Sequence, residues 1–127
     1  MSDWRDNLPK PAIGSIEVGD GWRPLVEYGY NLLKDYPCLS AAQIKEKFGG
    51  LRFYVDHDYE HGKCKDVDEW YEVEQILECL SLLMCEQCGA YGKQRTGGWV
   101  KTLCDSCHSK HEADRIGHKP VGSDTNE

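Results

Sequence analysis

Four cysteines are spaced as a metal site requires. They form two Cys-x-x-Cys pairs, Cys85/Cys88 and Cys104/Cys107, with fifteen residues between the pairs. Zinc takes four thiolates in a tetrahedron, and two residues between cysteines let one tight turn present two sulfurs at neighbouring corners. Gly89 follows the first pair and allows the positive φ that such a turn tends to need. The spacing therefore predicts a Zn²⁺ ion bound by these four cysteines.

The predicted zinc has a structural role, because four cysteine ligands leave none of its coordination positions open. Catalytic zinc usually keeps one position for water. His108 and His111 lie just beyond Cys107 and could in principle replace one sulfur. Since four well-spaced thiolates are present, we expect both histidines to be exposed residues of a helix.

The residues around the cysteines indicate how the site is built. Gly97-Gly98 separates KQRT from WVKTL, which predicts a short β-hairpin between the two pairs. The second pair opens the stretch SCHSKHEADRI, which predicts a helix. This order of knuckle, hairpin and second knuckle at a helix start resembles a treble-clef zinc finger.

The stretch TLCDSCHSKHEAD also resembles the last third of an HNH nuclease. That resemblance implies a catalytic histidine and an asparagine between the cysteine pairs, but the fifteen residues there contain no His, Asn or Asp. Only His108 matches the motif, and Asp56-His57 precedes the first pair. Hydrolysis would lack a local proton acceptor, so we expect no enzymatic activity.

The chain of 127 residues predicts one α+β domain with a modest core. Two helices are expected, GDGWRPLVEYGYNLLKDY, capped by Asp20 or Gly21 with Pro24 in its first turn, and DVDEWYEVEQILECLSLLM, which runs straight into Cys85. The first should bury Trp22, Leu25, Val26, Gly29, Leu33 and Tyr36. The second should bury Val67, Trp70, Val73, Leu77, Leu80 and Met84, with Ile76 and Leu83 widening the stripe.

Between these helices, QIKEKFGGLRFYV predicts a β-hairpin that turns at Gly49-Gly50. This register gives one largely apolar face. It consists of Ile44, Glu46, Phe48, Leu51, Phe53 and Val55, in the pairs Phe48–Leu51, Glu46–Phe53 and Ile44–Val55. The other face carries Lys45, Lys47, Arg52 and Tyr54, with Lys47 opposite Arg52. Like charges there need an acidic counterpart, either an external partner surface or the second helix through Glu72 or a neighbour.

Both helices are expected to pack on the hairpin, with the zinc finger as a C-terminal cap. The predicted divisions of the chain are an N-terminal arm with a short edge strand (1–18), an α+β body (19–84), the finger (85–118) and a disordered tail (119–127).

The net charge of −7 is concentrated in one segment. Residues 66–92 contain seven Asp and Glu and no Lys or Arg, while residues 93–119 have six cations against three acids. A candidate nucleic-acid surface consists of Lys93, Arg95, Trp99 and Lys101, since cations with a stacking ring suit single strands. Nucleic-acid-binding domains are usually clearly basic, which makes this the weaker interpretation.

The remaining cysteines, Cys38, Cys64 and Cys79, are expected to be spare thiols in a cytoplasmic protein. The first residues show no secretory signal, and no apolar run is long enough to span a membrane. His57, His61 and Cys64 could form a second metal site, but a solvated loop is the favoured interpretation.

Four motifs in the order GDGW, QIKEKFGGLRFY, CEQCG and GGWVKTLCDSC resemble a group of small zinc-finger proteins of bacteria and bacteriophages. The resemblance covers roughly residues 19–108 and implies no established activity. It associates the chain with phage genomes. We therefore expect a non-enzymatic zinc-binding module that binds a host protein as a phage-related regulator or inhibitor. The alternative is a nucleic-acid-binding protein or a degenerate HNH-type nuclease.

Overall fold

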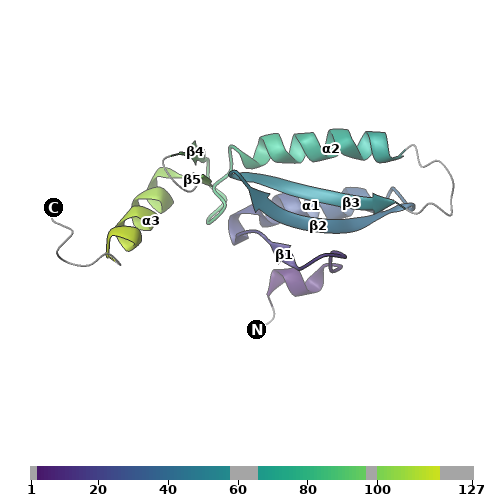
Figure 1. Cartoon of the computed structure of the whole chain (residues 1–127), viewed down its shortest axis with the longest axis horizontal. Helices are drawn as coiled ribbons and strands as arrows, with labels where there is room; N and C mark the ends of the chain where they lie inside the picture. Colours follow the sequence, from purple (N-terminus) through teal and green to yellow (C-terminus); the bar gives the residue numbers. More distant parts are fainter. Residues whose placement is uncertain (1–2, 58–65, 97–99, 118–127) are drawn as a thin grey trace.

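The computed structural model describes residues 3–57, 66–96 and 100–117. It has a mixed α+β fold, as predicted, with β4, β5 and α3 at one end of a larger body (Figure 1). The elements in chain order are the 3₁₀ turn η1 (Trp4–Asn7), β1 (Ile16–Glu17), the 3₁₀ turn η2 (Asp20–Trp22), α1 (Arg23–Leu33), β2 (Leu39–Lys47), β3 (Gly50–His57), α2 (Asp66–Ser81), β4 (Lys93–Arg95), β5 (Lys101–Leu103) and α3 (Asp105–Gly117).

The core of the body lies between a three-stranded sheet and two helices. The strand order is β1-β2-β3, with β1 parallel and β3 antiparallel to β2. Helix α1 covers one face of this sheet and α2 runs along its β3 side (Figure 1). Phe53 lies at the centre, with its ring 5.2 Å from that of Tyr30 and 5.3 Å from that of Trp70. The largest fully buried side chains of the body are Trp22, Val26, Ile44, Leu51, Phe53, Trp70 and Leu77. Burial of each of these side chains stabilises the fold by about 1.5–3 kcal/mol. The four cysteines of the predicted metal site are not part of this core cluster.

Helix α1 confirms the first predicted helix but begins later than expected. Residues Asp20–Trp22 form a 3₁₀ turn, so Trp22, and not Asp20 or Gly21, occupies the N-cap position. Pro24 lies in the first helical turn, where its missing N–H would have no intrahelical partner. The predicted core residues Trp22, Leu25, Val26 and Gly29 are buried, and Leu33 and Tyr36 pack at the edge of the core.

The hairpin β2–β3 is confirmed, but its register differs from the prediction by two residues. The turn is Phe48-Gly49, where φ is 54° and 82°, as a type I′ turn requires at both central positions. Lys47 therefore pairs with Gly50, and the predicted pair of Lys47 with Arg52 is wrong.

A shift of two residues leaves each side chain on the face where it was predicted. Ile44 pairs with Phe53, and both are buried, whereas the predicted partner of Ile44, Val55, pairs with Ala41 beyond a bulge. Phe48 was expected on the apolar face, but it sits in the turn and is 65% exposed. The sequence around Gly49 and Gly50 allows a turn at Phe48-Gly49 or at Gly49-Gly50. The alternation of apolar and polar side chains along the strands is the same in both registers.

Helix α2 confirms the second predicted helix from Asp66 onward, but it ends at Ser81, short of Met84. The N–H groups of Leu83 and Met84 bond three residues back, to Leu80 and Ser81, which tightens the last turn. The chain is then free to form an isolated bridge between Met84 and Tyr91. Ile76, Leu80 and Leu83 were predicted to be buried, but they are exposed.

The buried face of α2 is completed by a polar side chain that an apolar pattern cannot reveal. Ser81 is fully buried, and its Oγ accepts a 2.8 Å hydrogen bond from the backbone N–H of Leu51. The indole N–H of Trp70 donates to the carbonyl of Phe53 at 3.3 Å. Helix α2 thus satisfies backbone groups along the outer edge of β3, an edge that would otherwise be open to another strand.

The N-terminal arm supplies the predicted edge strand, since Ile16 of β1 pairs with Ile44 of β2. Ile16 and Val18 are buried in the core. Cys38 is disulfide-bonded, so the expectation of a spare thiol there is wrong, whereas Cys79 is a free and exposed thiol as expected. The number of cysteines in a sequence does not show which of them lie close enough in space to form a disulfide. Cys64 and the predicted tail from residue 119 lie outside the described residues.

Candidate metal centre

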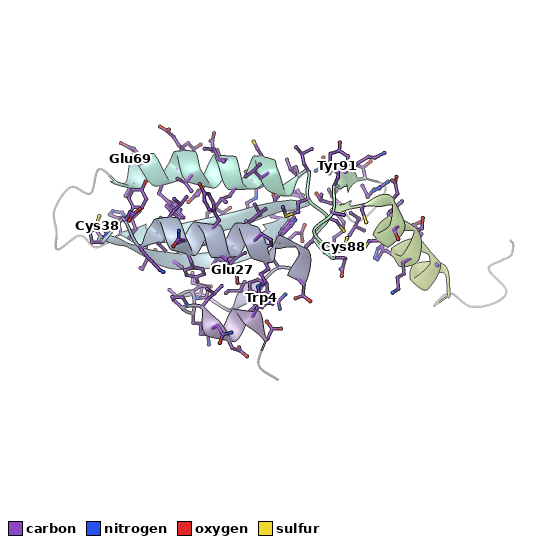
Figure 2. The ribbon with its side chains drawn as sticks, turned by 180° about the vertical axis from the view of Figure 1, so that it is seen from behind. Trp4, Glu27, Cys38, Glu69, Cys88 and Tyr91 are labelled. Carbon is purple, nitrogen blue, oxygen red and sulfur yellow. The ribbon has the colours of Figure 1, made fainter. Side chains whose placement is uncertain are left out.

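The four predicted ligands converge at the junction between the body and the C-terminal unit. The Sγ atoms of Cys85, Cys88, Cys104 and Cys107 all lie within 4.8 Å of one another. Cys85 is fully buried, Cys104 and Cys107 are half-buried and Cys88 is exposed at the outer side. Figure 2 shows the sulfur atoms near Cys88 beside the start of α3. Four soft thiol ligands at this separation fit a tetrahedral metal ion.

Local backbone geometry sets the positions of the sulfurs. Gly89 has φ of 84°, as predicted, and its N–H bonds to the Cys85 carbonyl at 2.8 Å. The N–H of Cys85 bonds in turn to the carbonyl of Ala90 at 2.7 Å, closing the first knuckle. The second pair follows the predicted hairpin β4–β5, and Cys107 lies in the first turn of α3. Its N–H points at the sulfur of Cys104, at 3.4 Å.

The thiols are electrostatically coupled to one another. Burial raises the pKa of Cys85, but hydrogen bonds from the backbone N–H groups of Cys104, Cys88 and Gln87 outweigh burial and lower it to about 7. The neighbouring Cys104 sulfur raises the pKa of Cys107 to about 12. Four thiolates so close together repel one another, so their joint deprotonation requires a cation among them.

A glycine loop of the body cradles the first knuckle. The N–H of Gly21 donates to the carbonyl of Glu86 at 2.7 Å. A Cβ on Gly21 would lie 2.1 Å from the carbonyl oxygen of Cys85 and 2.5 Å from the nitrogen of Gly89. The indole of Trp22, next in the chain, donates to the carbonyl of Met84 at 2.7 Å. This close approach of two backbones explains the GDGW motif, because only glycine fits at position 21.

The tip of the body hairpin holds the other side of the finger. Thr102 Oγ1 donates to the carbonyl of Gly49 at 2.6 Å, and the amide of Gln94 donates to the carbonyl of Phe48 at 2.8 Å. Lys101 Nζ lies 3.8 Å from a carboxylate oxygen of Glu46. Described residues from all four sequence motifs therefore meet at one junction between the body and the C-terminal unit.

Glu86 is a buried acid of the junction that the sequence analysis did not single out. Its carboxylate accepts from the N–H of Gly19 at 3.0 Å and lies 3.6 Å from Lys101 Nζ, although the side chain is only 6% exposed. Its backbone bonds Gly21 on one side and Thr102 on the other. A charged residue inside a Cys-x-x-Cys turn is normally exposed, so the only available signal was the lone acid between Cys85 and Cys88.

All three cations of the candidate nucleic-acid surface are engaged in internal ion pairs. Arg95 lies 2.7 Å from Asp105, and Lys93 lies 3.9 Å from the same carboxylate. Lys101 reaches Glu46 and Glu86, as described above. Trp99 lies outside the described residues. The cations of this hairpin thus neutralise acids of the junction and of α3.

On the polar face of the body hairpin, Arg52 pairs with Glu78 of α2 at 3.1 Å. An acid of α2 therefore faces the cations of this hairpin, as one of the two predicted alternatives held, but the acid is Glu78 and not Glu72. The like-charged pair on this face is Lys45 with Arg52. Lys47 Nζ lies 5.6 Å from the ring centre of Phe48, and Tyr54 is half-buried.

His57 lies far from the cysteine cluster. His57 ends β3, seven residues from its start at the finger side, a distance of about 24 Å along a strand. His61 lies outside the described residues. His111 is exposed as expected, but His108 is half-buried, and its Nδ1 is buried with no hydrogen-bond partner among the described residues.

Comparison with protein-family models, with curated proteins and with solved structures finds no match to this chain. Within the described residues, no helix combines the length and the apolar character that crossing a membrane demands.

Proposed function

We propose that this protein is a non-enzymatic zinc-binding module that acts by binding another protein. The convergence of four thiols within 4.8 Å carries the metal part of the proposal. Four sulfur ligands favour Zn²⁺ and fill its coordination shell, which leaves no position for a substrate or a catalytic water. The order of knuckle, hairpin and helix supports a treble-clef finger.

The surroundings of the four cysteines support a structural role for the ion. Gly21 contacts Glu86 of the first knuckle, and Thr102 contacts the tip of the body hairpin, through backbone and buried hydrogen bonds. These are packing contacts. The motifs that resemble those of phage and bacterial proteins lie at this junction, so the resemblance supports the same architecture in those proteins and in this chain. We extend it to the role of a regulator or inhibitor of a host system, in the cytoplasm.

Metal analysis of the purified protein tests the metal part. We expect about one zinc per chain in the wild type, and much less in Cys88→Ser. Cys79→Ser is the matched control, because Cys79 is also exposed and free but lies outside the cluster. Wild-type protein with far less than one zinc would contradict the proposal, as would zinc retained in full by Cys88→Ser.

Capture of partners from bacterial lysate, with and without nuclease treatment, tests the interaction part. A protein partner should survive nuclease treatment. Capture that disappears with nuclease would favour the nucleic-acid alternative. Divalent-metal-dependent cleavage of DNA or RNA that is abolished by His108→Ala would establish the nuclease alternative instead.

A further inference from the structure

Helix α2 has a second apolar stripe that faces away from the core. Ile76 and Leu80 of α2, and Leu83 two residues beyond its end, are 56%, 45% and 53% exposed. Trp70, Leu77 and Ser81, on the side of α2 that faces the core, are fully buried. A helix that rests on one sheet needs only one apolar face, so the fold of this chain does not account for the second stripe.

The second stripe is hollowed where its apolar part begins. A shallow depression of about 420 Å³ is lined by Glu72, Gln75, Ile76, Cys79 and Leu80. Its wall is largely apolar, with one carboxylate at the end nearer the start of α2. In Figure 2, Glu69 lies near the start of α2 and Tyr91 lies beyond its end. All five residues belong to α2, so the depression is a shallow apolar surface of one helix, against which the apolar face of another amphipathic helix can pack.

The charges beside the stripe define the partner. Asp68 and Glu72 precede Ile76 by two turns and one turn on the same side of α2, and both are exposed. Neither carboxylate forms an ion pair within the part of the chain that the structure describes. Glu78 and Glu86 of the same segment are paired, with Arg52 and Lys101. Residues 66–92 contain no Lys or Arg, so any cation that pairs with Asp68 or Glu72 comes from outside the segment.

A second copy of this chain does not meet that need. In an antiparallel pair of α2 helices, Asp68 and Glu72 of one copy would face a segment of the other copy that contains no Lys or Arg. In a parallel pair, acid would lie against acid. Both arrangements desolvate carboxylates without a counter-charge, which is costly.

We propose that this docking stripe, defined as Asp68, Glu72, Ile76, Cys79, Leu80 and Leu83, binds a basic amphipathic helix of the partner protein. The partner helix presents apolar side chains to Ile76, Leu80 and Leu83. About one to two helical turns further along, it presents Lys or Arg side chains to Glu72 and Asp68. This inference rests on the proposed protein-binding function and names the class of partner and the surface that receives it.

Binding of model peptides tests the docking stripe. The probes are three fluorescein-labelled helical peptides of about 18 residues, long enough to cover the 16 residues of α2. They share one Leu/Ala face and carry Lys, Gln or Glu on the flanks. We expect the Lys peptide to bind at least roughly ten-fold more tightly than the Glu peptide. Added salt should weaken its binding.

Matched substitutions locate the site. Ile76→Ser and Leu80→Ser should each weaken binding of the Lys peptide roughly ten-fold, while Ile13→Ser should not. Ile13 is the control because it is 58% exposed, against 56% for Ile76. Equal binding of all three peptides, or an Ile76→Ser variant that binds like the wild type, would overturn the proposal. So would a wild-type dimer in analytical ultracentrifugation that Ile76→Ser dissociates, because it would make a second copy the occupant.

Partner capture separates this inference from the function on which it rests. If wild type and Ile76→Ser capture the same partner equally well, the protein-binding function stands and the docking stripe is wrong. If the Lys peptide binds at the stripe but no protein survives nuclease treatment in the capture experiment, the stripe stands and the proposed function is wrong.

Discussion

Thr102 Oγ1 donates a 2.6 Å hydrogen bond to the carbonyl of Gly49, although the two residues lie 53 positions apart in the chain. Gly49 is the second residue of the turn in the body hairpin, and Thr102 is the central residue of β5 in the finger. This bond fixes the tip of the sheet against the metal-binding unit. With the contact of Gly21 on Glu86, it makes the cysteine cluster a junction of the whole fold.

Thr102→Val tests the hairpin side of the junction. Valine keeps the shape of threonine but leaves the buried Gly49 carbonyl without its donor, which should lower the free energy of unfolding by about 1–3 kcal/mol. Thr96→Val is the control, because Thr96 is exposed, and it should change stability by less than about 0.5 kcal/mol. Equal stability of the two variants in urea unfolding would show that the bond contributes nothing.

Gly21→Ala tests the loop side. The new Cβ would lie 2.1 Å from the backbone oxygen of Cys85, which no side-chain movement can relieve. We expect a loss of about 3 kcal/mol or more and faster release of zinc to a chelator. Gly50→Ala is the matched control, because its Cβ would meet side chains alone, and the nearest atom, at 3.2 Å, belongs to the flexible side chain of Glu78. The two variants are compared by thermal unfolding and by zinc release, and a Gly21→Ala variant no worse than the control would refute the cradle.

Ser81→Ala tests the protection of the β3 edge by α2. The substitution removes the acceptor of the Leu51 N–H, and a buried unsatisfied donor costs about 1–3 kcal/mol. Ser106→Ala, at an exposed position of α3, should be nearly neutral. Amide hydrogen exchange should show faster exchange at Leu51 in Ser81→Ala. Unchanged protection of that amide would mean that α2 does not shield the strand edge.

The pH dependence of stability should reflect Glu74 of α2. Burial raises the pKa of this carboxyl from 4.5 to about 7. The folded protein therefore holds the proton more tightly than the unfolded chain, and this stabilisation is complete below about pH 4.5 and is lost as the pH rises through 7. Glu74→Gln stays neutral, so relative to the wild type it should gain about 1–2 kcal/mol above pH 7, a range that allows for solvent screening of a half-buried group.

Urea unfolding at about pH 5.5 and about pH 8.5 measures this difference for Glu74→Gln. Glu72→Gln, at an exposed position of the same helix, controls for the change in net charge. Comparison with the wild type at each pH removes any effect of zinc loss that all three proteins share. If Glu74→Gln gains no more stability at the higher pH than Glu72→Gln does, Glu74 is not the source of the pH dependence.

The elements of the body were predictable because their signals are local. Apolar periodicity located α1 and α2, and alternation located β2 and β3 together with the buried face around Phe53. The register was not predictable, since Gly49-Gly50 and Phe48-Gly49 both give two-residue turns with the same alternation. In the observed Phe48-Gly49 turn, the carbonyl of Gly49 accepts a hydrogen bond from Thr102, which is distant in the sequence. The end of α2 was missed for a similar reason, because Met84 is drawn into a bridge with Tyr91 and a bond from Trp22.

The convergence of the four cysteines was predictable from spacing alone, because a Cys-x-x-Cys turn is a local structure. The residues that hold the site in the fold were not, because Gly21 and Glu86 are brought together from positions far apart in the sequence. Ser81 and Glu86 are polar yet buried, and hydrophobic patterns assign such residues to the surface. Their roles follow from the hydrogen bonds they make to Leu51 and Gly19.

The claim that the metal site joins the finger to the body is tested most directly by two-dimensional ¹⁵N–¹H NMR before and after zinc is removed with a chelator. We predict that the amide signals of residues 85–108 collapse and that those of Gly21 and Gly49, with the Trp22 indole, shift or broaden. Signals of Phe53 and Leu77 should keep their native positions. Unchanged signals of Gly21, Gly49 and Trp22 in protein shown to be free of zinc would contradict the account.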